Sequence, residues 1–187
     1  MDLTHIFPYI PPIILIDLDN TIADLDCAVK KRMEEKHPEI EWPPRTEFEY
    51  HTSITQETRN ILQEPGLFLS LPIIKDAVES IQEMKDEGYQ IFFCSSSVSQ
   101  YDPCVKEKFQ WIDKYFGKDA TRRLIIAKDK TLICGDYLID DKIQTGVVEF
   151  PMWKQIIFHQ PYNTQYHGLR MENWKDWRSV IKSIKKS

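Results

Sequence analysis

Cysteine and glycine are scarce in this chain, and long apolar runs are missing from it. Its 187 residues include six glycines and four cysteines, and the cysteines stand at positions 27, 94, 104 and 134. No two of them form a CxxC pair, and no His/Cys cluster has zinc-site spacing, so we expect four reduced thiols. No apolar run approaches the ~20 residues that a membrane span requires, so we expect no membrane segment.

Positive charge is also in deficit. The chain has 24 Lys and Arg against 29 Asp and Glu, a formal net charge of -5. This balance argues against binding to a nucleic acid polymer or an acidic membrane, because both need a basic surface. A small anionic ligand is still allowed, since it needs only local positive charge or a metal ion. The first residues, MDLTHIFPYIPP, lack a basic n-region and predict neither a signal peptide nor a mitochondrial presequence. A cytoplasmic location is therefore expected.

Five short apolar runs predict the strands of a sheet. They are residues 13–16, 90–93, 124–127, 137–139 and 155–158. Each run is continuous instead of alternating with polar residues, which is typical of strands buried on both faces of a parallel sheet.

Three segments predict helices by the spacing of their apolar residues. Residues 74–87 have apolar positions at intervals of three and four and are followed by Gly88. In residues 103–116 the apolar side consists of Val105, Phe109, Ile112 and Phe116. A closing stripe, capped by Asn173, consists of Trp174, Trp177, Ile181 and Ile184. Strands alternating with helices predict an α/β fold, a Rossmann-like three-layer sandwich around a parallel sheet.

One long segment interrupts this alternation. Almost fifty residues without a clear strand separate the first apolar run from the helix near residue 74, and they are charged, aromatic and interrupted by prolines. A structureless loop of that length is unusual in a compact domain. We therefore expect a core of residues 1–24 and 73–187, with residues 25–72 forming a small helical cap inserted after the first strand.

Two acidic pairs follow apolar runs. Asp17 and Asp19 come directly after the first run, and Asp140 and Asp141 end the run at 137–139. Residues two apart on a strand share a face, and ligands of open α/β sheets bind outside the carboxyl ends of the strands. We therefore expect the four carboxylates to converge, which is destabilising unless a cation such as Mg²⁺ binds or one group is protonated. Asp136 precedes its run and is expected at the opposite end.

Hydroxyl groups and lysines follow two other runs. Ser95, Ser96 and Ser97 end the run at 90–93, and their hydroxyls and backbone N–H groups suit phosphate oxygens. Lys128 and Lys130 follow the run at 124–127, and a lysine there stabilises the carboxylates and contacts a phosphate as a point charge.

Taken together, these motifs resemble those of the haloacid-dehalogenase (HAD) superfamily of phosphotransferases. The stretch DLDNT from Asp17 is similar to its DxDxT signature, and Ser95, Lys130 and the pair Asp140–Asp141 are similar to its later motifs, in the same order. The stretches PIIKDAVESIQEM, FFCSSS, EKFQWIDKYFG, KDKTLICGDYLIDD and WKDW resemble the 5'(3')-deoxyribonucleotidases over roughly residues 12–182.

The resemblance implies a role for each matching residue. Asp17 would attack phosphorus and form an aspartyl-phosphate, and Asp19 would act as general acid and then base. Mg²⁺ would be bound by the side chains of Asp17 and Asp141 and by the backbone carbonyl of Asp19. Asp140 would orient this set from behind. The phosphate oxygens would be held by Ser95, Ser96 and Lys130.

The same resemblance implies that the cap selects the substrate, a nucleoside monophosphate. Phe48, Tyr50 and Phe68 would stack on the base, although their type alone suits a cap core equally well. Leu25 stands where the family usually has an aromatic residue, and Lys142–Ile143 replace the usual Arg-Pro. The related nucleotidases are often dimers, so a homodimer is also expected.

Three other functions are compatible with parts of the pattern. A capped phosphatase of phosphosugars or other small metabolites would share the fold and the catalytic residues. A response-regulator module also combines acids, a hydroxyl and a lysine, but its adjacent acidic pair closes the first strand, whereas here that pair comes late. A catalytically inactive nucleotide-binding protein would not need the full acidic set.

Overall fold

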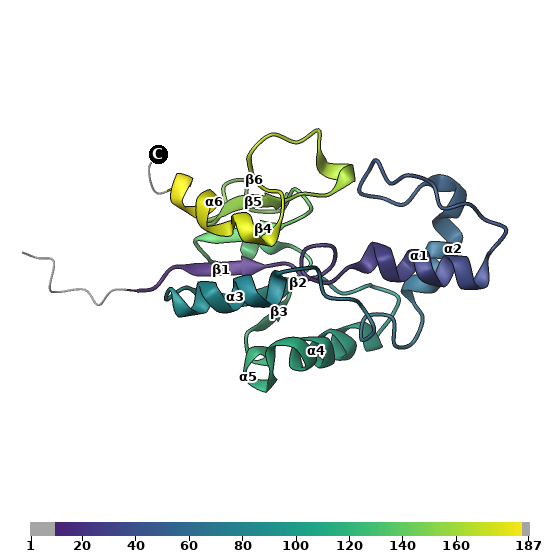
Figure 1. Cartoon of the computed structure of the whole chain (residues 1–187), viewed down its shortest axis with the longest axis horizontal. Helices are drawn as coiled ribbons and strands as arrows, with labels where there is room; N and C mark the ends of the chain where they lie inside the picture. The colour runs from purple at the N-terminus through teal and green to yellow at the C-terminus, as the bar shows by residue number, and fades with distance from the viewer. Residues whose placement is uncertain (1–9, 185–187) are drawn as a thin grey trace, which may run out of the picture.

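A computed structural model describes residues 10–184 of the chain (Figure 1). Its strands are β1 (Ile13–Ile16), β2 (Gln90–Ser95), β3 (Leu124–Ile126), β4 (Tyr137–Asp140), β5 (Lys154–Phe158) and β6 (Leu169–Met171). Its α-helices are α1 (Leu25–Lys36), α2 (Thr55–Leu62), α3 (Ala77–Asp86), α4 (Pro103–Phe116), α5 (Lys118–Thr121) and α6 (Trp177–Ile184). Its 3-10 turns are η2 (Thr52–Ile54), η3 (Lys130–Leu132), η4 (Pro161–Asn163) and η5 (Trp174–Asp176).

The described strands form one parallel sheet in the order β3-β2-β1-β4-β5-β6. This confirms the predicted parallel α/β fold. β6 was not predicted, because it has three residues and a central Arg170 instead of an apolar run. The order places β1 beside β4, unlike the 2-1-3-4-5 order of response regulators, so the fold does not favour a response-regulator module.

The two faces of the sheet are covered differently. Ile14 and Ile16 of β1 point into the large core cluster, which includes buried residues of α3, α4 and α6. Leu15 points to the other face and belongs to a smaller cluster with Trp153 and Ile133. Ile133 and Trp153 come from the connections that precede β4 and β5, which therefore supply part of this outer layer.

Two predicted helices differ in detail from the structure. The helix expected from residue 74 begins at Ala77, because Asp76 has a φ of 64° and breaks the helical path. The expected apolar side of α4 is partly wrong, since Phe109 is 38% exposed. The buried residues of α4 are Cys104, Glu107, Lys108, Trp111 and Ile112. The closing stripe is confirmed: all four of its residues are buried.

The segment between β1 and α3 contains two α-helices, α1 and α2. In Figure 1, α1 and α2 lie together beyond one end of the sheet. An ion pair of 2.9 Å between Arg32 and Glu64 links α1 to the segment after α2. The chain leaves and returns at one point, where Ala23 and Ile73 form an antiparallel bridge. The expected cap boundaries, after residue 24 and before residue 73, lie beside this bridge. The division into core and cap stays a prediction.

The cysteines and the helix lengths bear on two further features. All four cysteines are free, with Cys94 and Cys104 buried. Within residues 10–184, no helix is both long enough and apolar enough to cross a bilayer.

Candidate active site

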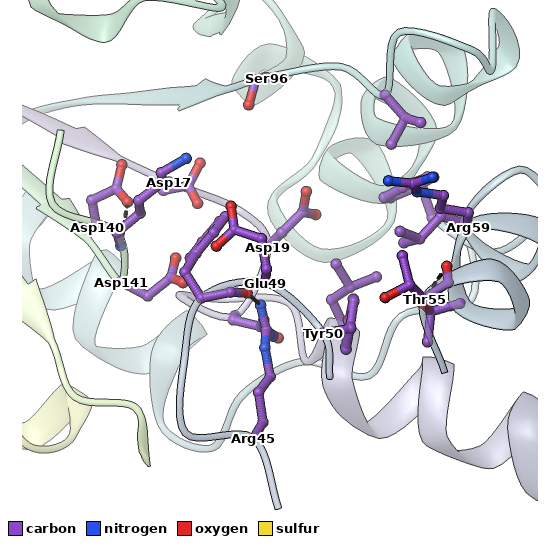
Figure 2. Close-up of a pocket in the computed structure, with 18 of the residues that line it drawn as sticks. Asp17, Asp19, Arg45, Glu49, Tyr50, Thr55, Arg59, Ser96, Asp140 and Asp141 are labelled. Carbon is purple, nitrogen blue, oxygen red and sulfur yellow. Dashed lines mark hydrogen bonds between the residues drawn. The ribbon is translucent and has the colours of Figure 1, made fainter. Parts of the chain in front are cut away.

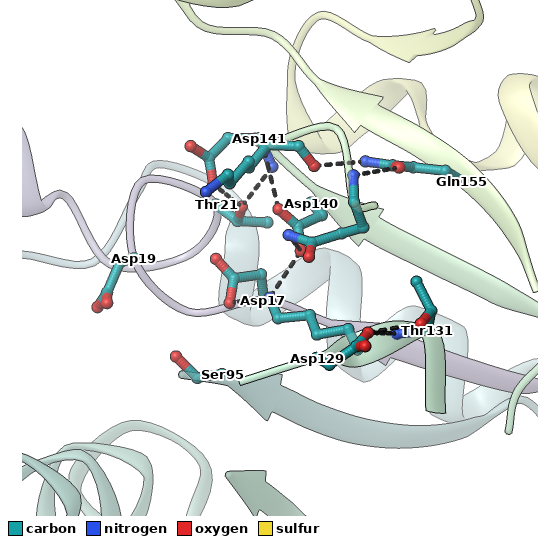
Figure 3. Close-up of polar contacts among 12 residues, drawn as sticks. Asp17, Asp19, Thr21, Ser95, Asp129, Thr131, Asp140, Asp141 and Gln155 are labelled. Atoms are coloured by element: carbon teal, nitrogen blue, oxygen red, sulfur yellow. Dashed lines mark hydrogen bonds and ion pairs between the residues drawn. The ribbon is translucent and has the colours of Figure 1, made fainter. Parts of the chain in front are cut away.

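Three carboxylates meet at the carboxyl ends of β1 and β4. These strands are parallel neighbours, so Asp17, just after β1, lies beside Asp140 and Asp141 at the end of β4 (Figure 3). One oxygen from each of the three lies within 4.8 Å of the others, and all three residues are buried. The predicted convergence is therefore present for these three acids.

Lys130 joins two of these acids. It lies on η3, which begins where the Asp129 side chain accepts a hydrogen bond from the Thr131 backbone. Its Nζ lies 2.5 Å from Asp17 Oδ1 and 2.6 Å from Asp140 Oδ2. Burial alone would lower the pKa of Lys130, but Asp140 and Asp17 outweigh burial and raise that pKa above its ordinary value. The ammonium has three N–H donors, so one is left for a phosphate oxygen.

Asp140 has both carboxylate oxygens engaged by the protein. Oδ1 accepts a hydrogen bond of 2.8 Å from the Lys142 backbone. Oδ2 accepts bonds from Lys130 and from the Gln144 side chain. Burial raises the pKa of Asp140 to about 6 even though Lys130 opposes the shift. These contacts suit a residue that orients the site from behind, as the resemblance implies.

Asp141 has neutral hydrogen-bond donors where Asp17 and Asp140 have a lysine. Thr21 Oγ1 donates to Asp141 Oδ1 at 3.2 Å, and the Tyr162 hydroxyl donates to Oδ2 at 2.6 Å. Burial and the negative charges of Asp140 and Asp17 raise the pKa of Asp141 well above its usual value. Ionised Asp141 is thus held at an energetic cost that a cation beside Asp17 would relieve.

Asp19 does not join this group, contrary to the expectation that all four acids converge. Its Oδ2 lies 2.5 Å from Lys108 Nζ on α4. The shared face expected for Asp17 and Asp19 holds only within a strand, and β1 ends at Ile16 while Asn20 turns the chain with a φ of 56°. Burial raises the pKa of Asp19, with Lys108 opposing and Asp17 reinforcing the shift. A raised pKa suits a group that must carry a proton.

Two of the three predicted phosphate ligands, Ser95 and Ser96, lie at the end of β2. Ser95 is buried, and its Oγ accepts a hydrogen bond of 2.9 Å from Lys108. Ser96 is exposed and lines the pocket described below. Lys128 points elsewhere, since it bonds to Ser97 O and to Ser99 Oγ.

Asp136 lies at the other end of the sheet, as expected. Its side chain accepts a hydrogen bond of 2.7 Å from the Ile13 backbone, at the start of β1.

A pocket of about 580 Å³ opens in front of these groups (Figure 2). Asp17, Asp19 and Lys130 line one part of it, and Thr55 and Arg59 of α2 line another. The four residues predicted to select the substrate all contribute to its wall: Leu25, Phe48, Tyr50 and Phe68. The pocket therefore connects the acids to side chains of the predicted cap, and most of its accessible lining is apolar.

Nearly the whole chain matches one family of known proteins. A model of the family "5' nucleotidase, deoxy (Pyrimidine), cytosolic type C protein" matches residues 11–187. The chain belongs to this family. The predicted resemblance to the deoxyribonucleotidases is thereby confirmed, and the chain is a phosphoric monoester hydrolase.

Individual relatives agree with this assignment. A Bordetella pertussis protein named "Putative 5'(3')-deoxyribonucleotidase" is 36% identical, covering 90% of this chain and 95% of its own. The human "5'(3')-deoxyribonucleotidase, cytosolic type" is 29% identical, and the match covers 91% of this chain and 93% of the human protein. A solved structure of a Bacillus subtilis HAD-hydrolase bound to magnesium has a TM-score of 0.58 at 8% identity. The match covers 92% of this chain and 99% of that one. This last likeness shows that the fold is HAD-like.

The fold of this nucleotidase-family chain brings to the site several residues that the sequence pattern did not predict. Lys108 was missed because lysines on helices are usually exposed, although it shares helical spacing with Cys104 and Trp111. Tyr162 was missed because η4 lies outside every predicted element. Thr21 is part of DLDNT but was given no role.

Arg45 was missed as well. It pairs with Asp26 and bonds to the Phe48 carbonyl, and its guanidinium lies 4.3 Å from the Tyr50 ring centroid. The Tyr50 hydroxyl also donates to Asp26, at 3.0 Å. Asp26 thus anchors the segment that carries Phe48 and Tyr50 into the pocket, while Asp24 caps α1 by accepting a bond from the Cys27 backbone.

The donor set of this family member fits a hard divalent cation. Four carboxylates face two buried lysines, Lys108 and Lys130, which leaves two negative charges when all are ionised. The oxygens of Asp17 and Asp141 lie close together, and both carboxylate oxygens of Asp141 accept hydrogen bonds from neutral donors. Carboxylate oxygens with this excess of negative charge are the ligands that Mg²⁺ prefers.

Proposed function

We propose that this enzyme is a Mg²⁺-dependent phosphatase of deoxyribonucleoside monophosphates that works through an aspartyl-phosphate. The observation that carries the proposal is the separation of two acids at one pocket. Asp17 is paired with Lys130 beside Asp141, whereas Asp19 is paired with Lys108. Asp17 would thus attack phosphorus beside Lys130, and Asp19, held apart from it, would protonate the leaving oxygen, as nucleophile and general acid require.

In the first step, a carboxylate oxygen of Asp17 attacks phosphorus and the bond from phosphorus to the sugar oxygen breaks. Asp19 gives its proton to that oxygen, which would otherwise leave as a poor alkoxide. The remaining N–H of Lys130 and the hydroxyl and backbone groups of Ser95 and Ser96 hold the phosphoryl oxygens. The products are a nucleoside and an aspartyl-phosphate at Asp17.

In the second step, water attacks the phosphorus of the aspartyl-phosphate. Asp19, now ionised, takes a proton from that water, and the bond to Asp17 breaks. Inorganic phosphate leaves, and Asp17 returns as a carboxylate while Asp19 is again protonated.

Mg²⁺ would be held by the side chains of Asp17 and Asp141 and by the backbone carbonyl of Asp19. When bound, it would neutralise the charge that otherwise repels a carboxylate from a phosphate dianion. Asp140 would support the set by holding Lys130, and Thr21 and Tyr162 would orient Asp141.

Residues 25–72 would act as the cap that selects the leaving group. Phe48, Tyr50 and Phe68 would contact the base, and Leu25 would leave more room than the aromatic usual at its position. An apolar wall near the sugar would disfavour a ribose hydroxyl without a partner, by ~1–3 kcal/mol. The names of the relatives support a nucleotide substrate over a phosphosugar.

The test is phosphate release from a substrate panel. It should include deoxyribo- and ribonucleoside monophosphates, phosphoglycolate and sugar phosphates, each with Mg²⁺ and with excess chelator. We expect turnover of deoxyribonucleotides that stops in chelator. Turnover of phosphoglycolate or sugar phosphates with none of deoxyuridine or thymidine monophosphate would contradict the proposal.

A further inference from the structure

The face of α2 that lines the pocket has one charged side chain. Residues three and four apart share a face of a helix, and the residues of α2 that line the pocket have this spacing: Thr55, Thr58, Arg59 and Leu62. Figure 2 shows Arg59 and Thr55 on the side of the pocket opposite Asp17 and Asp140. Arg59 is exposed, so a ligand in the pocket can reach its guanidinium group.

The guanidinium group of Arg59 has no partner within residues 10–184. No hydrogen bond, ion pair or ring contact joins it to another residue of this range. Every other arginine of the chain has such a contact, with an acid, an amide or an aromatic ring. The helix itself supplies no acid, since the residues three and four positions from Arg59 are Thr55, Gln56, Leu62 and Gln63. The donors of Arg59 are therefore available to a ligand.

Arg59 is also the group on this face of α2 that can still donate hydrogen bonds. The Thr58 hydroxyl donates to the Ile54 carbonyl at 2.8 Å, and the Thr55 hydroxyl donates to the His51 carbonyl at 3.1 Å. The remaining member of the face is apolar. A guanidinium group has five N–H donors and no acceptor, so this face suits a ligand group that accepts hydrogen bonds.

The position of Arg59 decides which part of a substrate it meets. This inference rests on the proposed function, in which the phosphate meets Asp17 and Lys130. The base of a nucleoside monophosphate lies at the other end of the molecule from the phosphate. Figure 2 shows Tyr50, which we propose to contact the base, between the acids and the residues of α2. The edge of the base that points away from the sugar therefore faces Arg59.

We propose that Arg59 binds this edge of the base and selects deoxyribonucleotides that have a carbonyl oxygen there. Thymine and uracil present the oxygen O4, which accepts hydrogen bonds, whereas cytosine presents an amino group, which donates them. The amino group would face the donors of Arg59, and neither side would find an acceptor. The result is a preference for thymidine and deoxyuridine monophosphates over deoxycytidine monophosphate.

The experiment compares deoxyuridine and deoxycytidine monophosphates, which have nearly the same size and differ at this edge. For wild type we expect kcat/KM to be about tenfold or more higher with deoxyuridine monophosphate, the usual effect of a hydrogen bond to a charged group. Arg59→Met should remove most of this ratio by lowering kcat/KM for deoxyuridine monophosphate. Arg59→Glu should invert the ratio, since a carboxylate accepts hydrogen bonds from the cytosine amino group. Arg122→Met, which removes an exposed arginine of another helix end, is the matched control and should leave the ratio unchanged.

Two further substrates separate recognition of the base from a general attraction for anions. Acetyl phosphate has no base, so its kcat/KM should be the same in wild type and Arg59→Met. Deoxyuridine 3',5'-bisphosphate has a second phosphate, and its loss in Arg59→Met should equal the loss with deoxyuridine monophosphate. Because Arg59 is exposed and unpaired, the variants should keep the circular dichroism spectrum and the Tm of wild type. Arg59→Lys, which keeps the charge and loses the planar fork, should retain only part of the ratio.

Each outcome decides the inference. An unchanged ratio between the two monophosphates in Arg59→Met would overturn it. An equal loss with acetyl phosphate, or a larger loss with the bisphosphate, would also overturn it, because Arg59 would then attract anions instead of binding the base. The proposed function fails separately if wild type releases phosphate from acetyl phosphate and from neither deoxyribonucleotide. In that case there is no base for Arg59 to select, and the inference falls with the proposed function.

Discussion

Lys130 Nζ lies 2.5 Å from Asp17 Oδ1, so the proposed nucleophile is held by a buried ammonium group. A second bond, of 2.6 Å, ties the same lysine to Asp140. Lys130 is thus fixed between two carboxylates that would otherwise repel each other. The bond also orients the Asp17 carboxylate before any substrate binds, which reduces the reorganisation that the attack requires.

Lys130→Met should both destabilise the protein and inactivate it. The substitution leaves Asp17 and Asp140 buried without their cation, which typically costs about 3–5 kcal/mol. Urea denaturation at pH 7 measures the loss in the free energy of unfolding. Lys128→Met is the control, since Lys128 contacts only exposed loop atoms, and it should cost less than about 1 kcal/mol. A Lys130→Met protein as stable as wild type would contradict this account.

Asp141→Asn should stabilise the protein when metal is removed by a chelator. The pKa of Asp141 is raised in the folded state, so the folded chain binds this proton more tightly than the unfolded chain. The free energy of unfolding contributed by Asp141 is therefore largest below its ordinary pKa. It falls as pH rises, by about 1.4 kcal/mol per pH unit, until the folded pKa is passed. The Asp141→Asn protein does not have this pH-dependent loss. Its free energy of unfolding should therefore exceed that of wild type by an amount that grows from pH 4 toward pH 7.

Urea denaturation across that pH range, with and without Mg²⁺, measures the effect. Mg²⁺ should stabilise wild type and leave Asp141→Asn unchanged. Asp119→Asn, at a fully exposed position, is the control and should follow wild type. An advantage of Asp141→Asn that shrinks as the pH rises would show that Asp141 is not an uncompensated buried charge.

The sequence was most informative where a residue's place follows from a strand end. Asp17, Asp140 and Asp141 could be predicted to meet because each follows an apolar run of a parallel sheet. Asp19 could not be placed, because its direction depends on the turn at Asn20 and on a lysine from α4. Periodicity within a strand says nothing about the chain after the strand ends.

The apolar pattern of α4 shows a second limit. The buried face of α4 includes Glu107 and Lys108. Because these charged residues interrupt the apolar pattern, the pattern assigns Phe109 to the buried face instead. Glu107 is buried because it accepts hydrogen bonds from the Gly66 and Phe68 backbones. These are long-range contacts that no local pattern reveals. β6 and η4 were missed because each has three residues and no continuous apolar run.

Tyr162→Phe should weaken the binding of Mg²⁺ without preventing catalysis. The substitution removes the 2.6 Å hydrogen bond to Asp141 and keeps the ring that packs against Arg45 and Phe48. Losing such a supporting contact typically lowers metal affinity by about 10–100-fold. The Mg²⁺ concentration for half-maximal activity is the measurement, with Tyr115→Phe on α4 as control. An unchanged Mg²⁺ requirement would show that Tyr162 does not support the metal site.

Phe48→Ala should impair nucleotides selectively. Base stacking on an aromatic side chain contributes roughly 1–3 kcal/mol, so kcat/KM for thymidine monophosphate should fall about tenfold or more. Acetyl phosphate, which has no base, should be affected much less. Phe109→Ala, at an exposed position of α4, is the control for losing a phenyl ring. Equal losses with both substrates would indicate that Phe48 serves the fold instead of the substrate.

The most direct test of the central claim is mass spectrometry of enzyme quenched with acid during turnover of 4-nitrophenyl phosphate. Asp19→Asn should be run beside wild type, because loss of the base in the second step should let the intermediate accumulate. We predict one phosphoryl group on the peptide that contains Asp17, and none on the same peptide of Asp17→Asn, which should fold but release no phosphate. Turnover with no adduct in either active protein, or an adduct on another residue, would contradict the account.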